Sequence, residues 1–148
     1  MVMAVKQFER LFREAASLDI DKSDIKRLEN FINARLHDLL ILGEAAAKAN
    51  GRDVIEVHDL PITRGFQEQI HQFRKMDETI ALAGILEHLA KLPPLSLAYS
   101  EELEQKLPEL AGAITISLAK VFKAVSPKLK NPGTAEWEQI EEIYRILL

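Results

Sequence analysis

The stretch that decides the fold lies between two helical patterns and reads Asn50-Gly51-Arg52-Asp53-Val54-Ile55-Glu56-Val57-His58-Asp59-Leu60. Gly51 follows a long helical pattern, and a glycine at that place accepts the left-handed conformation that closes a helix. Three β-branched side chains within residues 54–57 disfavour helix and predict a short extended segment. Asp59 then predicts the start of the next helix, because its carboxylate can accept the free N–H groups of a first turn.

The composition bounds the class of protein. The chain has 148 residues, of which 47% are hydrophobic and only 6% are aromatic. This suits an all-α fold in a single compact domain over residues 1–148, with a core of aliphatic side chains. No apolar run reaches the roughly 18 residues of a membrane span, the first residues lack a signal-like pattern, and cysteine is absent. We therefore expect a cytoplasmic protein without membrane contact, disulfides or thiolate metal sites.

Apolar residues recur at helical spacing in six segments, which predict six helices. Their ranges are 5–16, 21–50, 60–75, 81–91, 99–125 and 135–147. Past Leu36 the second segment is apolar on most sides, and its inner stripe includes Leu42, so we expect other elements to cover it from two directions. Pro108 in the fifth segment predicts a kink, or else a later helix start.

The order of these elements occurs twice, as a short, a long and a short helix in each of two halves, residues 5–75 and 79–148. A shift of 75 residues superposes Leu28 on Leu103, Leu39 on Ile114, Gly51 on Ser126 and Asp59 on Thr134. Few letters are identical, so the repeat is one of pattern. Such a half cannot bury its long helix alone, whereas two crossed halves can.

This layout resembles the histone fold. The first half is similar to archaeal histones, whose motif Gly-Arg-x-Thr-Ile followed by Asp-Leu or Asp-Ile stands here as Gly51-Arg52-Asp53-Val54-Ile55 with Asp59-Leu60. The resemblance implies two tandem histone folds packed as an intramolecular handshake pseudo-dimer, as in a small uncharacterised bacterial family of single-chain double histone-fold proteins. It also implies a structural ion pair between Arg52 and Asp59 that braces the loop. The second half has Pro127 and Thr134 at these positions and lacks the brace.

The resemblance further implies DNA contacts at paired loops, with loop 18–22 beside loop 126–130. The candidate DNA-binding residues are Lys22, Arg52, Lys128 and Lys130. Four cations with acids close by form a small phosphate footprint, because about six to ten phosphate contacts are ordinary for tight binding. The formal net charge of −4 also disfavours a nucleic-acid partner. The lysines can equally be a solvated loop, and the Arg52–Asp59 pair can be purely structural.

Other chemistry has little support in the sequence. Glu68 and His71 have the spacing of a carboxylate-bridged metal site, but the further Glu and His ligands of such a site have no counterpart. We find no nucleophile elbow and no glycine-rich phosphate loop. We therefore expect no enzyme activity, no metal and no cofactor.

Two hypotheses follow. The first is a non-enzymatic histone-like interaction or scaffold module that binds an unknown protein partner or self-associates. The alternative is a weak, sequence-independent DNA-binding architectural protein of the nucleoid-associated kind. The resemblance places Ala49 and Ala124 where archaeal histones carry a histidine that joins dimers, so we expect a monomer with an internal pseudo-dimer rather than a histone-style tetramer.

Overall fold

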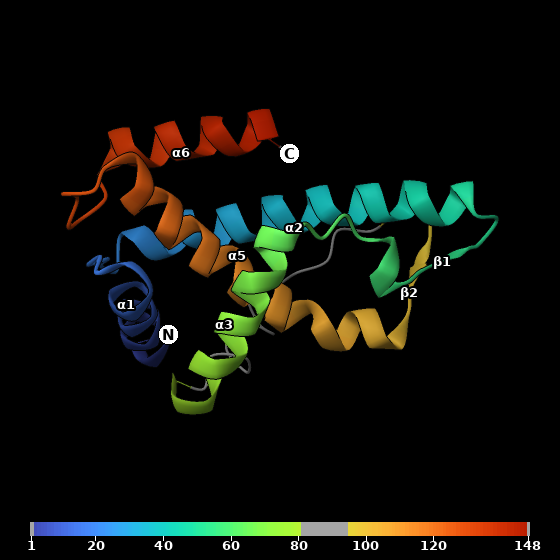
Figure 1. Cartoon of the computed structure of the whole chain (residues 1–148), viewed down its shortest axis with the longest axis horizontal. Coiled ribbons are helices and arrows are strands. Elements are labelled where there is room, and N and C mark those ends of the chain that lie inside the picture. The colour runs from blue at the N-terminus through green and yellow to red at the C-terminus, as the bar shows by residue number, and fades with distance from the viewer. Residues whose placement is uncertain (1, 81–94, 148) are drawn as a thin grey trace.

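The structure is a computed structural model that describes residues 2–80 and 95–147. Helices make up most of these residues, which confirms the predicted all-α class (Figure 1). The elements are α1 (Val2–Ala16), α2 (Asp24–Ala49), β1 (Val54–Ile55), the 3₁₀ turn η1 (Val57–Asp59), α3 (Arg64–Ile80), β2 (Ala98–Tyr99), α5 (Glu101–Val125) and α6 (Thr134–Leu147). The helix predicted over residues 81–91 lies outside the described residues.

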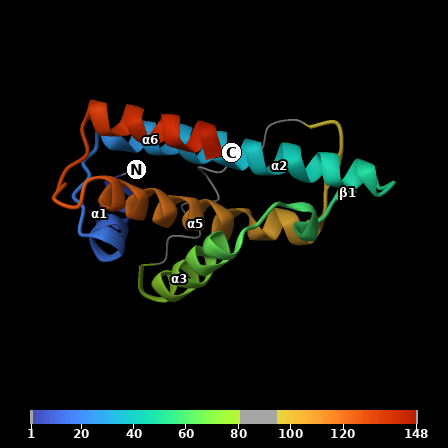
Figure 2. The same cartoon turned by 45° about the horizontal axis from the view of Figure 1, so that its top comes forward.

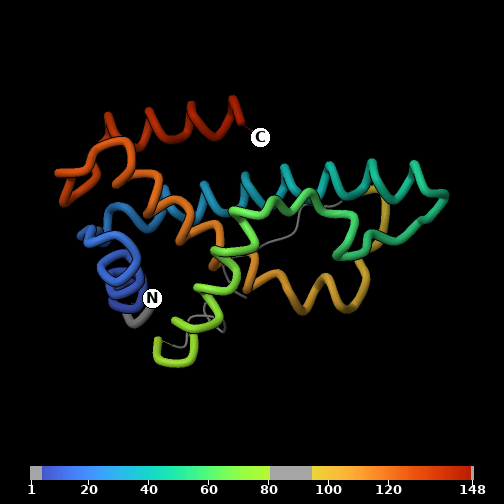
Figure 3. The backbone as a smooth tube through the Cα atoms, in the orientation of Figure 1, coloured from blue at the N-terminus to red at the C-terminus, as the bar shows by residue number. Residues whose placement is uncertain are grey.

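The long helices α2 and α5 come from different halves of the chain, and they run antiparallel and cross (Figures 1 and 3). Helices α1 and α3 pack against α5, and α6 runs beside the first part of α2 (Figure 2). Buried side chains from all these helices form one hydrophobic cluster. Both long helices thus contribute to a shared core. Of the helices described, none is long and apolar enough to span a membrane.

Helix α2 begins three residues later than predicted. Two acids hold the turn before the helix: the backbone N–H of Asp21 donates to Asp24 Oδ2 at 3.0 Å, and Asp21 Oδ1 accepts the backbone N–H of Ser23 at 2.8 Å. The N-cap itself is Ser23, whose side chain makes no capping hydrogen bond.

Helix α3 begins at Arg64, so the prediction that Asp59 opens this helix is wrong. Asp59 ends the turn η1 instead, and Leu60 is extended with φ −73° and ψ 140°. The residue before a proline avoids helical conformation, and Pro61 follows. The hydroxyl of Thr63 caps the helix by accepting the backbone N–H of Phe66 at 3.1 Å. The predicted extended segment is also shorter than residues 54–57, since only its first two residues form β1.

Helix α5 begins at Glu101, where the Ser100 hydroxyl accepts the backbone N–H of Leu103 at 3.1 Å. Pro108 lies inside the helix, and α5 is bent rather than straight (Figure 3), because a proline removes one backbone hydrogen bond and crowds the preceding turn. At Gly112 a side chain would overlap the Phe73 ring. The glycine therefore lets α3 pack directly against α5.

The prediction that Leu42 lies on the inner face of its helix is wrong, since this side chain is 46% exposed, and Leu147 at the end of α6 is 73% exposed. Helix α6 ends near the middle of α2 (Figure 1), so the later part of α2 is not covered by it. Helical spacing indicates which face of a helix is apolar, but it does not indicate how far the covering helix extends.

Candidate functional site

The loop after α2 is shaped by Gly51, whose φ is 71°. This left-handed conformation ends α2, and the backbone N–H of Arg52 donates to the carbonyl of Ala47 at 2.9 Å. Strand β1 then pairs in parallel with β2, with Val54 opposite Ala98. Gly51 thus turns the chain from the end of α2 into β1, and β1 pairs with β2, the strand just before α5.

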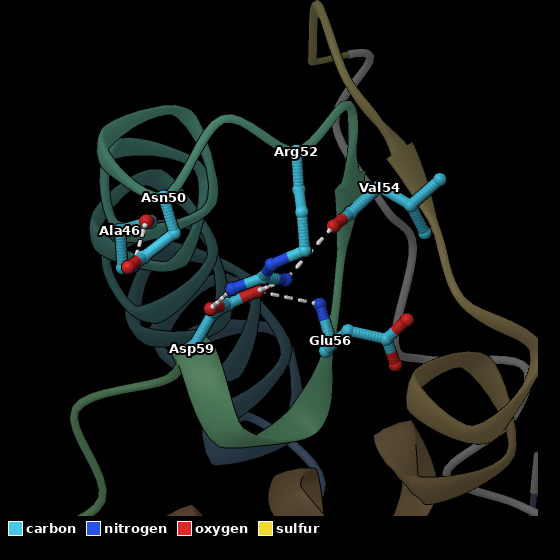
Figure 4. Close-up of polar contacts among 6 residues, drawn as sticks. All are labelled: Ala46, Asn50, Arg52, Val54, Glu56 and Asp59. Atoms are coloured by element: carbon cyan, nitrogen blue, oxygen red, sulfur yellow. Dashed lines mark hydrogen bonds and ion pairs between the residues drawn. The ribbon is translucent and has the colours of Figure 1, made fainter.

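The predicted ion pair between Arg52 and Asp59 is confirmed by its geometry. The guanidinium donates two hydrogen bonds, from Nη1 to Oδ2 at 2.8 Å and from Nη2 to Oδ1 at 2.5 Å (Figure 4). The Asp59 side chain is only 2% exposed, and it also accepts the Glu56 backbone N–H at 2.8 Å. The hydrogen bond from Arg52 lowers the pKa of Asp59 to about 2, and the Glu56 N–H acts in the same direction.

The Arg52 guanidinium is therefore engaged in holding this loop. Its Nη1 also points to the carbonyl of Val54 at 3.4 Å (Figure 4). Because the charge is neutralised by Asp59 and the donors face the loop itself, little of this side chain is left for a phosphate.

The second pair of loops lies at the opposite end of the molecule (Figure 1). There the loop between α1 and α2 meets the loop between α5 and α6, and the backbone N–H of Asp19 donates to the carbonyl of Lys130 at 2.6 Å. The expectation that loop 18–22 lies beside loop 126–130 is confirmed. Lys22, Lys128 and Lys130 are exposed on these loops, whereas the loop of Arg52 is at the far end.

Arg13 and Lys123 lie beside the same loops and were missed from the sequence. Arg13 Nη2 lies 3.5 Å from Asp19 Oδ1, so that charge is paired. The Lys123 ammonium donates to the carbonyls of Ser17 at 3.4 Å and Leu129 at 2.6 Å. Lys123 thus joins the two loops, whereas Arg13 makes an exposed ion pair with the first loop alone. The three lysines of the loops are exposed to solvent.

Trp137 and Asp24 form a second contact that sequence reasoning missed. The indole N–H of Trp137 donates to Asp24 Oδ1 at 3.1 Å, and the two residues are 1% and 6% exposed. Buried tryptophans need an acceptor for this N–H, which is the signal that the sequence offered. The partner is 113 positions away along the chain, so only the folded structure identifies it.

The end that carries β1 and β2 is rich in acids. Glu101, Glu102 and Glu104 occupy the first turn of α5, where negative charge favours the helix dipole. Glu44 on α2 accepts the backbone N–H of Leu97, the residue before β2, at 3.3 Å. This charge distribution disfavours phosphate at this end.

A groove of about 490 Å³ lies where α2, α3, α5 and α6 meet. Its apolar wall includes Leu39, Phe66, Ile114 and Leu147, one side chain from each of the four helices. No pattern in the sequence indicated this groove, because the four side chains come from segments that only the fold brings together. We refer to it below as the four-helix groove.

These elements define a small helical protein whose halves share one core and also meet at its two ends, through one short parallel strand pair and one hydrogen-bonded loop pair. The chain belongs to the family described as domain of unknown function DUF1931, and the match covers residues 8–145.

Relatives and solved structures extend this assignment. Two uncharacterised proteins of Aquifex aeolicus (strain VF5) are similar to the chain. One is 29% identical over 141 residues, covering 93% of this chain and 82% of its own, and the other is 31% identical over 139 residues, covering 85% and 81%. A crystal structure from Thermus thermophilus is 49% identical, with a TM-score of 0.87 and full coverage of both chains. One from Aquifex aeolicus is 26% identical, with a TM-score of 0.85 over 98% of this chain and 95% of its own.

Proposed function

We propose that this chain is a non-enzymatic, histone-like interaction module whose two halves clasp each other as an intramolecular handshake. Antiparallel crossing of α2 and α5 supports the handshake. So do the loop pairs, because at each end the loop before one long helix meets the loop after the other. In such a handshake, each half buries the surface by which it pairs with the other, so a partner would have to bind a different face.

The observation that carries the proposed function is an apolar surface around the end of α6. Ile146 and Leu147 are 77% and 73% exposed there. Leu42 is 46% exposed and lies one turn beyond Leu39 on the same face of α2, and Leu39 lines the four-helix groove together with Leu147. Large apolar side chains that gather on a surface are typical of protein contacts.

Charge supports a protein partner over a nucleic acid. The formal net charge is −4, the β1–β2 end is acidic, and Arg13, Arg52 and Lys123 are engaged within the protein. The affinity of proteins for nucleic acids comes largely from cations that are free to neutralise phosphates.

Site-specific photo-crosslinking tests the proposed function. A photoreactive amino acid would replace Leu42 or Ile146 in cells that produce the protein, with nuclease treatment before isolation. We expect the same discrete protein adduct from both positions, either to a second copy or to one partner. Glu138, which is exposed on the polar side of α6, is the matched control and should give none. Absence of adducts, or equal adducts from Glu138, would contradict the proposal.

A second candidate function is weak DNA binding, favoured by the position of Lys22, Lys128 and Lys130 on one loop pair. A gel-shift series at about 50 mM salt and micromolar protein tests it. Retarded DNA that is lost in the double variant Lys128→Glu with Lys130→Glu, and kept in Lys75→Glu on α3, would support the second function. No retardation at low salt would remove it.

A further inference from the structure

Two side chains that line the four-helix groove have buried polar atoms without a hydrogen bond to the residues that the structure describes. Arg35 on α2 is 9% exposed, and its guanidinium carbon lies 5.4 Å from the ring centre of Phe31. Its Nε is 3.1 Å from Asp38 Oδ2, yet it makes no hydrogen bond with any residue that the structure describes. Gln69 Oε1 on α3 is also buried, and over the same residues it has no hydrogen-bond partner. Buried polar atoms without partners are uncommon and call for an explanation.

Two hydroxyls lie near these atoms. Ser117 Oγ and Tyr144 Oη, from α5 and α6, are 2.6 Å apart and line the same groove. Burial raises the pKa of the Tyr144 hydroxyl, so this group keeps its proton at neutral pH. The groove thus combines an apolar wall with a polar patch formed by an arginine, an amide and a hydroxyl pair.

We propose that the four-helix groove binds a small amphiphile, an apolar chain that ends in an oxygen-acceptor head group such as a carboxylate. An acceptor oxygen in the groove would bond the guanidinium of Arg35, whose Nε is ion-paired with Asp38 but makes no hydrogen bond with the described residues, and charge-assisted hydrogen bonds of this kind are strong. Gln69 can present its NH₂ group to the same head group after rotation of its amide. The volume of about 490 Å³ lies within the range of small-molecule pockets.

Asp38 limits which head groups fit. This carboxylate is 35% exposed and offsets the charge of Arg35, so binding depends on the hydrogen bond to Nε and on burial of the apolar chain. A cationic head group would place its charge against the guanidinium and would leave Nε without an acceptor. Decanoate should therefore bind, and decylamine with the same chain length should bind at least about tenfold more weakly.

Two substitutions test the site by calorimetric titration with decanoate below its micelle concentration. Arg35→Met keeps the apolar stem and removes the donors, and we expect the dissociation constant to rise about tenfold or more. Gly65→Phe should abolish binding by filling the groove. Gly65 lines the groove, and a Cβ there would meet no atom within 4 Å, so the protein should still fold.

Matched variants separate specific binding from general effects. Arg145→Met removes an equal charge from an exposed position on α6 outside the groove, and Gly65→Ala adds only a methyl group. Both should retain decanoate binding within about threefold of the parent protein. No saturable binding at about 1 mM decanoate would overturn the proposal. It would also be overturned by equal binding of decylamine, or by unchanged binding in a folded Gly65→Phe variant. None of these outcomes depends on a protein partner or on the photo-crosslinking result.

Discussion

The two loop pairs take equivalent places at opposite ends of the molecule, yet different side chains hold them. At one end, Arg52 and Asp59 brace the loop after α2 through two charged hydrogen bonds. At the other end, Trp137 donates to Asp24 at 3.1 Å, and that carboxylate also accepts the backbone N–H of Asp21 at 3.0 Å. Each end thus has one buried aspartate as its central acceptor, but only one aspartate is paired with a cation.

The side-chain contact at the first end therefore depends on charge, whereas the contact at the second end depends mainly on packing. The Trp137 ring is 1% exposed and meets the Phe122 ring edge-on at 5.1 Å. Burying a side chain of this size contributes more than the single hydrogen bond that it donates. The first end also buries Ile55 and Leu60, at 0% and 6% exposed, but its ion pair adds a contribution that should vary with pH.

The largest effect is expected from Trp137→Ala. Removal of the ring leaves a cavity between α6 and the two long helices, and we expect the free energy of unfolding to fall by about 3–5 kcal/mol. Urea unfolding followed by circular dichroism measures it. Trp137→Phe is the matched variant, which keeps most of the bulk and loses the hydrogen bond to Asp24, and should cost about 1 kcal/mol. Equal losses in both variants would contradict the dominance of packing at this end.

Arg52→Met ranks next, between the two Trp137 variants. It keeps the aliphatic stem but leaves the Asp59 carboxylate, only 2% exposed, without its counterion. A buried charge that loses its partner is strongly destabilising. Thermal unfolding at pH 7 measures the loss. The control is Arg10→Met, which breaks an ion pair with Glu14 whose side chains are 53% and 42% exposed and should change stability by less than about 1 kcal/mol. Equal effects of the two variants would contradict the role of Arg52 as a brace.

The pH dependence of this loss is a sharper test of the brace. The pKa of Asp59 is lowered from 3.8 to about 2 in the folded protein, so its contribution to stability is complete above pH 3.8 and is lost as the pH falls toward about 2. We therefore expect the stability difference between the parent and Arg52→Met to be largest near neutral pH and to shrink as the pH falls toward about 2, below which Asp59 is protonated in both proteins. Urea titrations at steps of pH measure this difference. A gap that is unchanged down to pH 2 would show that Asp59 does not depend on Arg52.

How much the sequence could predict also differs between the two ends. Gly51, Arg52 and Asp59 lie within nine residues of one another, so a local motif was enough to predict the loop and its ion pair. Trp137 and Asp24 belong to different halves, and no local pattern joins them. The predicted start of α3 is wrong because Asp59 has the side chain of a helix cap, whereas Leu60, the residue before Pro61, is held in extended conformation.

Exposure was predicted less well than element type. Periodicity placed Leu28, Leu39, Leu103 and Ile114 correctly in the core, where each is at most 6% exposed. The same periodicity failed at Leu42, because burial also depends on where the covering helix ends. The four-helix groove has a related cause, since the start of α3 and the end of α6 meet the middle of α2 and α5 there, and helix ends are what periodicity determines least.

The smallest effect expected concerns how the helices end at the two loop pairs. Gly51 closes α2 with φ 71°, whereas Ser17 closes α1 with φ 53° and is a non-glycine residue in the left-handed region. A left-handed residue with a side chain costs about 1–2 kcal/mol, and the extra chain entropy of a glycine offsets about 0.5–1 kcal/mol of any gain. Ser17→Gly should therefore stabilise the protein by about 0.5 kcal/mol. Gly51→Ala should destabilise it by a similar amount or more. The alanine Cβ would meet no atom within 4 Å, so the cost would come from backbone strain alone. Thermal unfolding of both variants measures the two shifts. If Ser17→Gly is less stable than the parent, the serine side chain stabilises this loop by more than its left-handed backbone costs.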